Sequence, residues 1–207
     1  MKKVNWLCCL LLINGFLFWG SASAITLSFS PSSETVFVGD SFDVDVVVSG
    51  LSASNEIVSQ FDLDVLYDPS VLSATGIQFS GNLGVVDIDT VTVTDFSLGF
   101  VDLFESSFLS NLELELLQPD DSMTLATLSF VSVSEGMSLL TFGDDPLFGR
   151  SVVGSDFFTS LPLDTVGQSQ ATVLAQQISE PATALLVFGG GLLAAGMKKR
   201  KFKLAKN

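Results

Sequence analysis

Apolar and acidic residues alternate along two stretches of the chain, and this alternation constrains the fold more than any other feature. In Phe42–Val48 every second residue is apolar, and Asp43 and Asp45 fall on the opposite side of an extended strand. Phe61–Tyr67 repeats the pattern with Asp62 and Asp64. A period of two residues predicts half-buried β-strands, whereas helical periodicity is nearly absent from the central chain.

Further strands are expected along the rest of the central region. Leu112, Leu114 and Leu116 alternate with glutamates in the same way and predict one of them. Glycine, proline, aspartate and asparagine mark turns between the strands. Many short strands with frequent turns predict an all-β fold, a jelly-roll β-sandwich of about nine strands. The remaining strand candidates are Thr35–Val38, Ser73–Phe79, Val91–Phe96, Met123–Val133, Ser138–Phe142 and Ala171–Ala175.

The charge of the central region excludes several functions. Residues 25–177 contain 22 acidic residues and one basic residue, Arg150, which gives a net charge of −21. Such a domain does not bind nucleic acid by counterion release, which requires Lys and Arg. The chain has no histidine, and its two cysteines are Cys8 and Cys9. Catalysis relayed through histidine and a Cys/His zinc site are therefore excluded.

Residues 1–24 have the composition of a secretory signal peptide. Lys2-Lys3 precedes an apolar run, and Ala22-Ser23-Ala24 is a small-residue cleavage pattern, which places the mature start at Ile25. The alternative is a retained membrane anchor. An exported domain without cysteine depends on its core, not on disulfides, for stability.

Residues 178–207 predict a second signal. Glu180-Pro181 leads into an apolar segment that ends at Met197. The 17 residues from Pro181 to Met197 would span roughly 25 Å as a helix, which is short for a bilayer core of about 30 Å. We expect a short transmembrane helix over residues 181–197. The cluster Lys198–Lys201 would stay cytoplasmic by the positive-inside rule.

The motif, short helix and basic end resemble the PEP-CTERM sorting signal of Gram-negative bacteria that produce exopolysaccharide. The sequence departs from the family at Ser179, where proline is usual, and in its mostly lysine tail. The resemblance implies recognition by an exosortase at Glu180 and Pro181, an inner-membrane intermediate, and release to the cell surface or extracellular matrix. A simple C-terminal membrane anchor is the alternative.

The central domain, residues 25–177, resembles a cohesin domain. The residues that carry the resemblance are Val36–Asp40 followed by Phe42–Val48, then Phe61–Leu72 with its Tyr67-Asp68-Pro69 turn, and Leu125–Phe130 with the later Gly136. The resemblance implies a jelly-roll sandwich that binds dockerin modules through one sheet face, and related sandwiches bind polysaccharide. No binding residue is carried over, because no matched motif identifies that face.

Paired carboxylates are the candidates for catalysis. Asp43 with Asp45, and Asp62 with Asp64, each place two carboxylates on one strand face about 7 Å apart, a distance that a glycosidase can use. We favour a solvated outer face for both pairs, because antiparallel sheets commonly alternate in this way.

Acidic loops are the candidates for calcium. Calcium prefers oxygen ligands in loops, but no EF-hand spacing is present, so no cofactor is predicted beyond a possible calcium ion. The loop carboxylates are Asp87, Asp89, Asp120, Asp121, Asp144 and Asp145. We expect Arg150 to pair with a carboxylate, and contact with a ligand is the other possibility.

Three functions fit the sequence. The first is a non-catalytic extracellular interaction or adhesion module, with a dockerin-like protein as partner. The second is a carbohydrate-binding sandwich acting on extracellular polysaccharide, which is weakened because the central domain has no tryptophan and only Tyr67 as a tyrosine. The third, a carboxylate-pair hydrolase, lacks any recognised motif, so we expect the protein not to be an enzyme.

Intact mass spectrometry of the protein from the producing cell tests both terminal signals. We expect a mature chain that starts at Ile25 and ends near Glu180, because signal peptidase and exosortase would each remove one end. A species that ends at Asn207 would show that the tail is retained.

Overall fold

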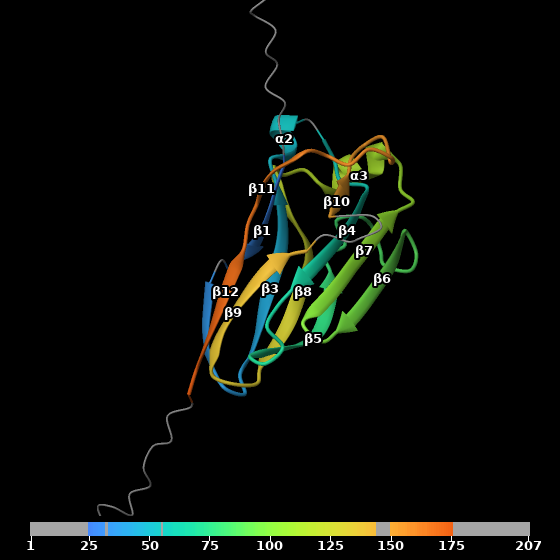
Figure 1. Ribbon diagram of the computed structural model, residues 1–207. Helices are drawn as coiled ribbons and strands as arrows, with labels where there is room; N and C mark the ends of the chain where they lie inside the picture. The colour runs from blue at the N-terminus through green and yellow to red at the C-terminus, as the bar shows by residue number, and fades with distance from the viewer. Residues whose placement is uncertain (1–24, 32, 55, 144–149, 176–207) are drawn as a thin grey trace, which may run out of the picture. The chain divides into compact units, whose positions relative to one another are not determined.

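The computed structural model describes residues 25–31, 33–54, 56–143 and 150–175 (Figure 1). The two predicted terminal signals and the loop carboxylates Asp144 and Asp145 lie outside these residues. None of the helices in the described ranges is long and apolar enough to cross a membrane.

Two sheets form a sandwich (Figure 1). The five-stranded sheet has the order β11-β1-β3-β8-β5, and the seven-stranded sheet has the order β2-β12-β9-β4-β7-β6 with β10 paired to β4. The strands of the first sheet are β11 (Leu163–Val166), β1 (Ile25–Ser30), β3 (Ser41–Ser49), β8 (Ser122–Ser132) and β5 (Leu72–Phe79). Those of the second are β2 (Ser33–Phe37), β12 (Ser169–Leu174), β9 (Gly136–Phe142), β4 (Gln60–Leu66), β7 (Phe100–Ser107), β6 (Thr90–Ser97) and β10 (Ser151–Val153).

The predicted β-sandwich is confirmed, and the alternating segments are β3 and β4. Twelve strands are present in the described residues, more than the expected nine or so, because the count includes short strands such as β10 and β11. These two strands, like β1 and β7, were not predicted from the sequence, although β1 alternates between apolar and polar residues.

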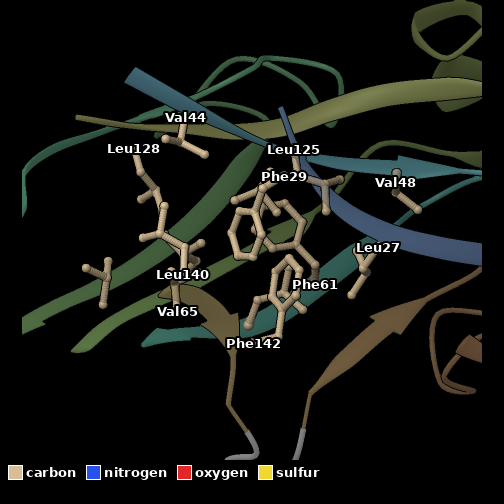
Figure 2. Close-up of a cluster of buried hydrophobic side chains, with 14 of the residues drawn as sticks. Leu27, Phe29, Val44, Val48, Phe61, Val65, Leu125, Leu128, Leu140 and Phe142 are labelled. Atoms are coloured by element: carbon tan, nitrogen blue, oxygen red, sulfur yellow. The ribbon is translucent and has the colours of Figure 1, made fainter. Parts of the chain in front are cut away.

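The core fills the space between the sheets, as the alternation requires. Val44, Val46 and Val48 of β3 are at most 1% exposed, and so are the inward residues of β4. Figure 2 shows inward side chains of both sheets meeting in one cluster. Phe29 of β1 stacks on Phe142 of β9 with ring centroids 4.3 Å apart, so this aromatic pair joins one sheet to the other.

The turn after β4 has the structure that its sequence indicates. Asp68 accepts hydrogen bonds at Oδ1 from the Ser70 amide (2.8 Å) and hydroxyl (2.6 Å). Its carbonyl accepts the amides of Val71 and Leu72. The Ser70 hydroxyl and amide hold the pKa of Asp68 below its ordinary value. Tyr67 packs its ring edge against Phe130 of β8, 5.4 Å between centroids.

The strand predicted from the alternation of Leu112, Leu114 and Leu116 is wrong, because Asn111–Leu117 forms helix α3. Glu113 accepts hydrogen bonds from the Ser110 amide (2.9 Å) and hydroxyl (2.7 Å) at the start of the helix, an arrangement that favours helix initiation. These contacts also lower the pKa of Glu113. Leu114 is buried, but Leu112 and Leu116 are exposed, so the leucines do not share one buried side.

Helix α3 is held to the sandwich just after its last turn. Gln118 accepts the Val58 amide at 2.8 Å and donates to the carbonyls of Val58 (2.8 Å) and Asn82 (3.1 Å). The short helix α2 (Leu51–Ser54) lies at the same end (Figure 1). Its Leu51 amide donates to the Asp121 carbonyl, and its Ser52 amide to Asp121 Oδ1.

Replacing Phe29 by alanine tests the role of the aromatic pair between the sheets. We expect Phe29→Ala to lower the free energy of unfolding by about 4 kcal/mol, because it removes a buried ring and leaves a cavity against Phe142. Phe158→Ala is the matched control, since that ring is 91% exposed and its loss should change stability by about 0.5 kcal/mol or less. Chemical denaturation measures both, and equal effects would contradict the assignment.

Candidate docking face

The outer faces of the two sheets differ in chemistry. Hydroxyl and carboxylate side chains dominate the outer face of the five-stranded sheet. Thr127 of β8 donates to Asp45 at 2.6 Å, and Ser129 donates to Asp43 at the same distance. Apart from the half-buried Val47 and Val131, the outward residues of β1, β3, β8 and β5 are polar. This face offers little apolar surface to a partner.

The outer face of the seven-stranded sheet exposes large apolar side chains. Leu66 is 40% exposed, Leu139 47%, Val93 54% and Met137 59%. Phe37 and Leu174, each 44% exposed, pair across β2 and β12 and extend the surface. We call the outer side of this sheet the apolar–acidic face. Its outward residues include Phe37, Asp62, Asp64, Leu66, Val91, Val93, Asp95, Asp102, Phe104, Met137, Leu139 and Leu174.

Carboxylates form a row across the apolar–acidic face. The strand register places Asp64 of β4 opposite Asp102 of β7, and Asp102 opposite Asp95 of β6. Side chains directly opposite on neighbouring strands lie about 5 Å apart at Cβ, and like charges there are destabilising. The register therefore places three carboxylates side by side on this face, between apolar residues.

The expectation of a solvated position is wrong for Asp64. This side chain is only 6% exposed, and Asp62 on the same strand is half-buried. The cause is long-range packing, since Gly143, which follows β9, donates its amide to the Asp64 carbonyl and lies close to the Asp64 side chain. Arg150 immediately precedes β10, whose Ser151 pairs with Asp62.

The two aspartate pairs do not form a common site. Asp43 and Asp45 lie on the outer face of the five-stranded sheet, and Asp62 and Asp64 lie on that of the other sheet. The sandwich core separates the pairs. Each pair therefore has a structural setting of its own: Thr127 and Ser129 donate to the first pair, and Asp64 of the second pair is largely buried.

The described loop carboxylates are spread over the surface. Asp121 Oδ1 accepts the Ser52 amide, and Asp89 Oδ2 accepts the Val85 amide at 3.0 Å. Asp87 and Asp120 are exposed. Among the described residues, no group of three or more acidic side chains is placed so that it could hold a metal ion. Calcium binding stays a prediction from the sequence.

Glu105 is the residue of this sheet that the sequence interpretation missed. It points inward from β7 with Val101 and Leu103 and is fully buried. Burial raises its pKa from 4.5 to about 7, while the nearby Thr90 hydroxyl acts in the opposite direction. A predicted strand at Phe100–Ser107 would have placed Glu105 inward by parity, but that segment has apolar residues on both sides and gives no clear alternation.

No protein-family model matches the sequence, and no curated protein matches it either. Solved cohesin structures are similar to the chain in fold. The seventh ScaB type I cohesin of Pseudobacteroides cellulosolvens is 13% identical with a TM-score of 0.56, and the match covers 76% of this chain and 97% of that chain.

Two structures from Acetivibrio cellulolyticus are similar to the same degree, each with a TM-score of 0.56. The sixth cohesin of scaffoldin B, solved in complex with a Cel5 dockerin, is 15% identical, with 73% of this chain and 99% of that chain covered. A type II cohesin domain from the cellulosome is 16% identical, with coverage of 72% and 95%. The cohesin resemblance of the sequence is therefore confirmed for the fold.

Neutralising the carboxylate at one end of the row tests whether repulsion between its like charges lowers the stability of the fold. We expect Asp95→Asn to raise the free energy of unfolding at low salt by roughly 0.5 kcal/mol, because it removes a like charge opposite Asp102. The gain should shrink in about 1 M salt, where screening acts over roughly 3 Å. Asp120→Asn, which removes the same charge from an exposed loop, is the control. Equal gains in both variants would show that only net charge matters.

Proposed function

We propose that this protein is a non-catalytic extracellular interaction module that binds a dockerin-like protein through the apolar–acidic face. The fold shared with solved cohesins supports this class of function. The sixth cohesin of scaffoldin B from Acetivibrio cellulolyticus, for example, was solved with a dockerin bound. Asp45 and Asp43 accept hydrogen bonds from Thr127 and Ser129, and Asp64 is only 6% exposed, so the settings of both aspartate pairs favour binding over hydrolysis.

The difference between the two outer faces carries the proposal. Exposed apolar side chains that gather on one surface mark interaction sites more often than scattered ones do. Of the two sheets, the seven-stranded one carries them, among them Leu66, Val93 and Leu139, whereas the other sheet presents hydroxyls.

Charge complementarity defines the chemistry of the partner. The row of Asp64, Asp102 and Asp95 crosses the face between the apolar residues. Residues 25–177 carry a net charge of −21, which repels acidic proteins and attracts basic ones over distances near the Debye length. The partner surface therefore combines apolar anchors with Lys or Arg side chains, and association weakens as salt increases.

The proposal includes export to the cell envelope or the exopolysaccharide matrix. Residues 1–24 would direct export, and residues 181–197 would hold the chain transiently in the inner membrane. An exosortase would then act at Glu180 and Pro181 and deliver the domain to the cell surface or matrix of a Gram-negative bacterium. This part is supported by the sequence patterns of the two ends.

Affinity capture with two leucine variants tests the proposed face. The full chain, purified in a mild detergent and immobilised, is exposed to the extracellular fraction of the producing strain, and retained protein and sugar are both identified. We expect a protein with a dockerin-like module to bind the wild type, and Leu139→Glu to reduce its binding at least tenfold by placing a charge in the face. Leu112→Glu on α3 is the matched control and should bind normally.

Each other outcome contradicts part of the proposal. Retained polysaccharide without protein would favour the carbohydrate-binding alternative. Equal losses in both leucine variants would place the contact elsewhere on the domain. If neither protein nor sugar is retained, the interaction function itself is wrong.

A further inference from the structure

Glu105 occupies a position on the inner side of β7 where a carboxylate is unexpected. It pairs with Phe61 of β4 and Thr92 of β6, and Thr90 lies diagonally across on the same inner side. The side chain is fully buried, and within the described residues neither carboxylate oxygen has a hydrogen-bond partner. A charged carboxylate in such a place has lost its hydration, and the nearby Thr90 hydroxyl offsets only part of that loss.

The charged groups of the surrounding elements do not stabilise a negative Glu105. Arg150, the only basic residue of the described ranges, precedes β10, and β10 pairs with the edge of β4 that faces away from β7. The inward residues of the opposite sheet near Phe61 are apolar, such as Phe79. The titratable groups of the neighbouring elements are all acidic: Asp62 and Asp64 on β4, Asp95 on β6, Asp102 on β7, Asp87 and Asp89 before β6, and Glu113 and Glu115 on α3.

The segment beside Glu105 lies at one edge of the seven-stranded sheet. β6 is an edge strand that pairs along its length only with β7. In the loop before it, Gly84 has φ +128°, and a Cβ there would lie 2.5 Å from that of Asp89. Asp87 also has a positive φ of 64°. The Thr90 hydroxyl is buried without a hydrogen bond in the described chain. An edge strand is hydrogen-bonded to a neighbour on one side only, so it opens at a lower free energy than a central strand does.

We propose that Glu105 is a proton-operated latch, which keeps the β6–β7 hairpin packed on the core while protonated and opens it when the proton is lost. In the packed state the protonated carboxyl donates its O–H to the Thr90 hydroxyl, which gives both buried groups a partner. Ionisation leaves a buried negative charge, and a single neutral donor such as the Thr90 hydroxyl does not replace its lost hydration. The hairpin then exposes Glu105 to water by separating at the β6 edge.

The direction of the pH effect follows from burial. Burial raises the pKa of Glu105 from 4.5 to about 7. Below about pH 4.5 the residue is protonated in both folded and unfolded chains, so its contribution is complete. Between pH 4.5 and 7 only the unfolded chain loses the proton, and stability falls as pH rises. Above pH 7 both states are ionised and the loss levels off, at roughly two orders of magnitude in the folding equilibrium constant.

The latch acts on the face described above, because β6 and β7 carry Val93, Asp95, Asp102 and Phe104. Its effect on partner binding rests on the proposed function, with tighter binding expected at mildly acidic pH. The latch itself is tested without any partner. Failure of the latch and failure of the docking proposal can therefore be distinguished.

The first test compares unfolding of the full chain and of variants from pH 4 to 9, in one detergent and at fixed salt. We expect Glu105→Gln to equal the wild type near pH 4 and to gain about 100-fold in folding equilibrium constant by pH 8. Glu105→Leu, which cannot titrate, should show the same rise relative to wild type even if its packing shifts the whole curve. Glu115→Gln, an exposed glutamate on α3, should run parallel to the wild type. Parallel curves for Glu105→Gln and wild type would overturn the proposal.

The second test locates the opening. Amide hydrogen exchange is compared between wild type and Glu105→Gln at the same pH, so that the chemical exchange rate cancels. We expect the wild type at pH 8 to lose protection mainly in β6, β7 and residues 84–90, and the two proteins to match at pH 5. A difference spread evenly over both sheets would show that Glu105 affects only global stability and would overturn the latch.

Discussion

Packing of apolar side chains between the two sheets is the interaction on which the rest of this domain depends. Residues 25–177 contain no cysteine, so no disulfide limits the unfolded chain. The Phe29–Phe142 stack and the Phe61–Phe79 contact each join a strand of one sheet to a strand of the other. Because these contacts fix the inner faces, the strand period of two residues then determines which side chains form each outer face.

The inner faces could be predicted from the sequence because they follow from local alternation. β3 and β4 bury the residues that their pattern indicates. The same criterion failed at Leu112–Leu116, where a Ser110-to-Glu113 capping box starts a helix. That signal is visible in the sequence, since serine followed three residues later by glutamate is typical of a helix start. The capping box therefore favours a helix in this segment, although the leucines alternate with a period of two.

The candidate face could not be predicted, because it depends on register between distant strands. Asp64, Asp102 and Asp95 come from three strands, and only their pairing makes them a row. The burial of Asp64 likewise depends on Gly143, which is far from it in sequence. The cohesin resemblance implied a binding face without identifying it. The proposed choice of face rests on the contrast between apolar Leu66 and Leu139 on one sheet and hydroxyls on the other.

The outward carboxylates and the buried Glu105 lie in contrasting environments on the same sheet. Outward carboxylates such as Asp95 supply the negative charge that the proposed basic partner would contact. Glu105, on the inner side of the neighbouring strand, is fully buried, and burial raises its pKa to about 7. One strand pair thus carries carboxylates in two environments, one exposed on the outer side and one buried on the inner side. Environment rather than residue type separates them, and the proposed latch would let a change in pH act on the hairpin through the buried carboxylate.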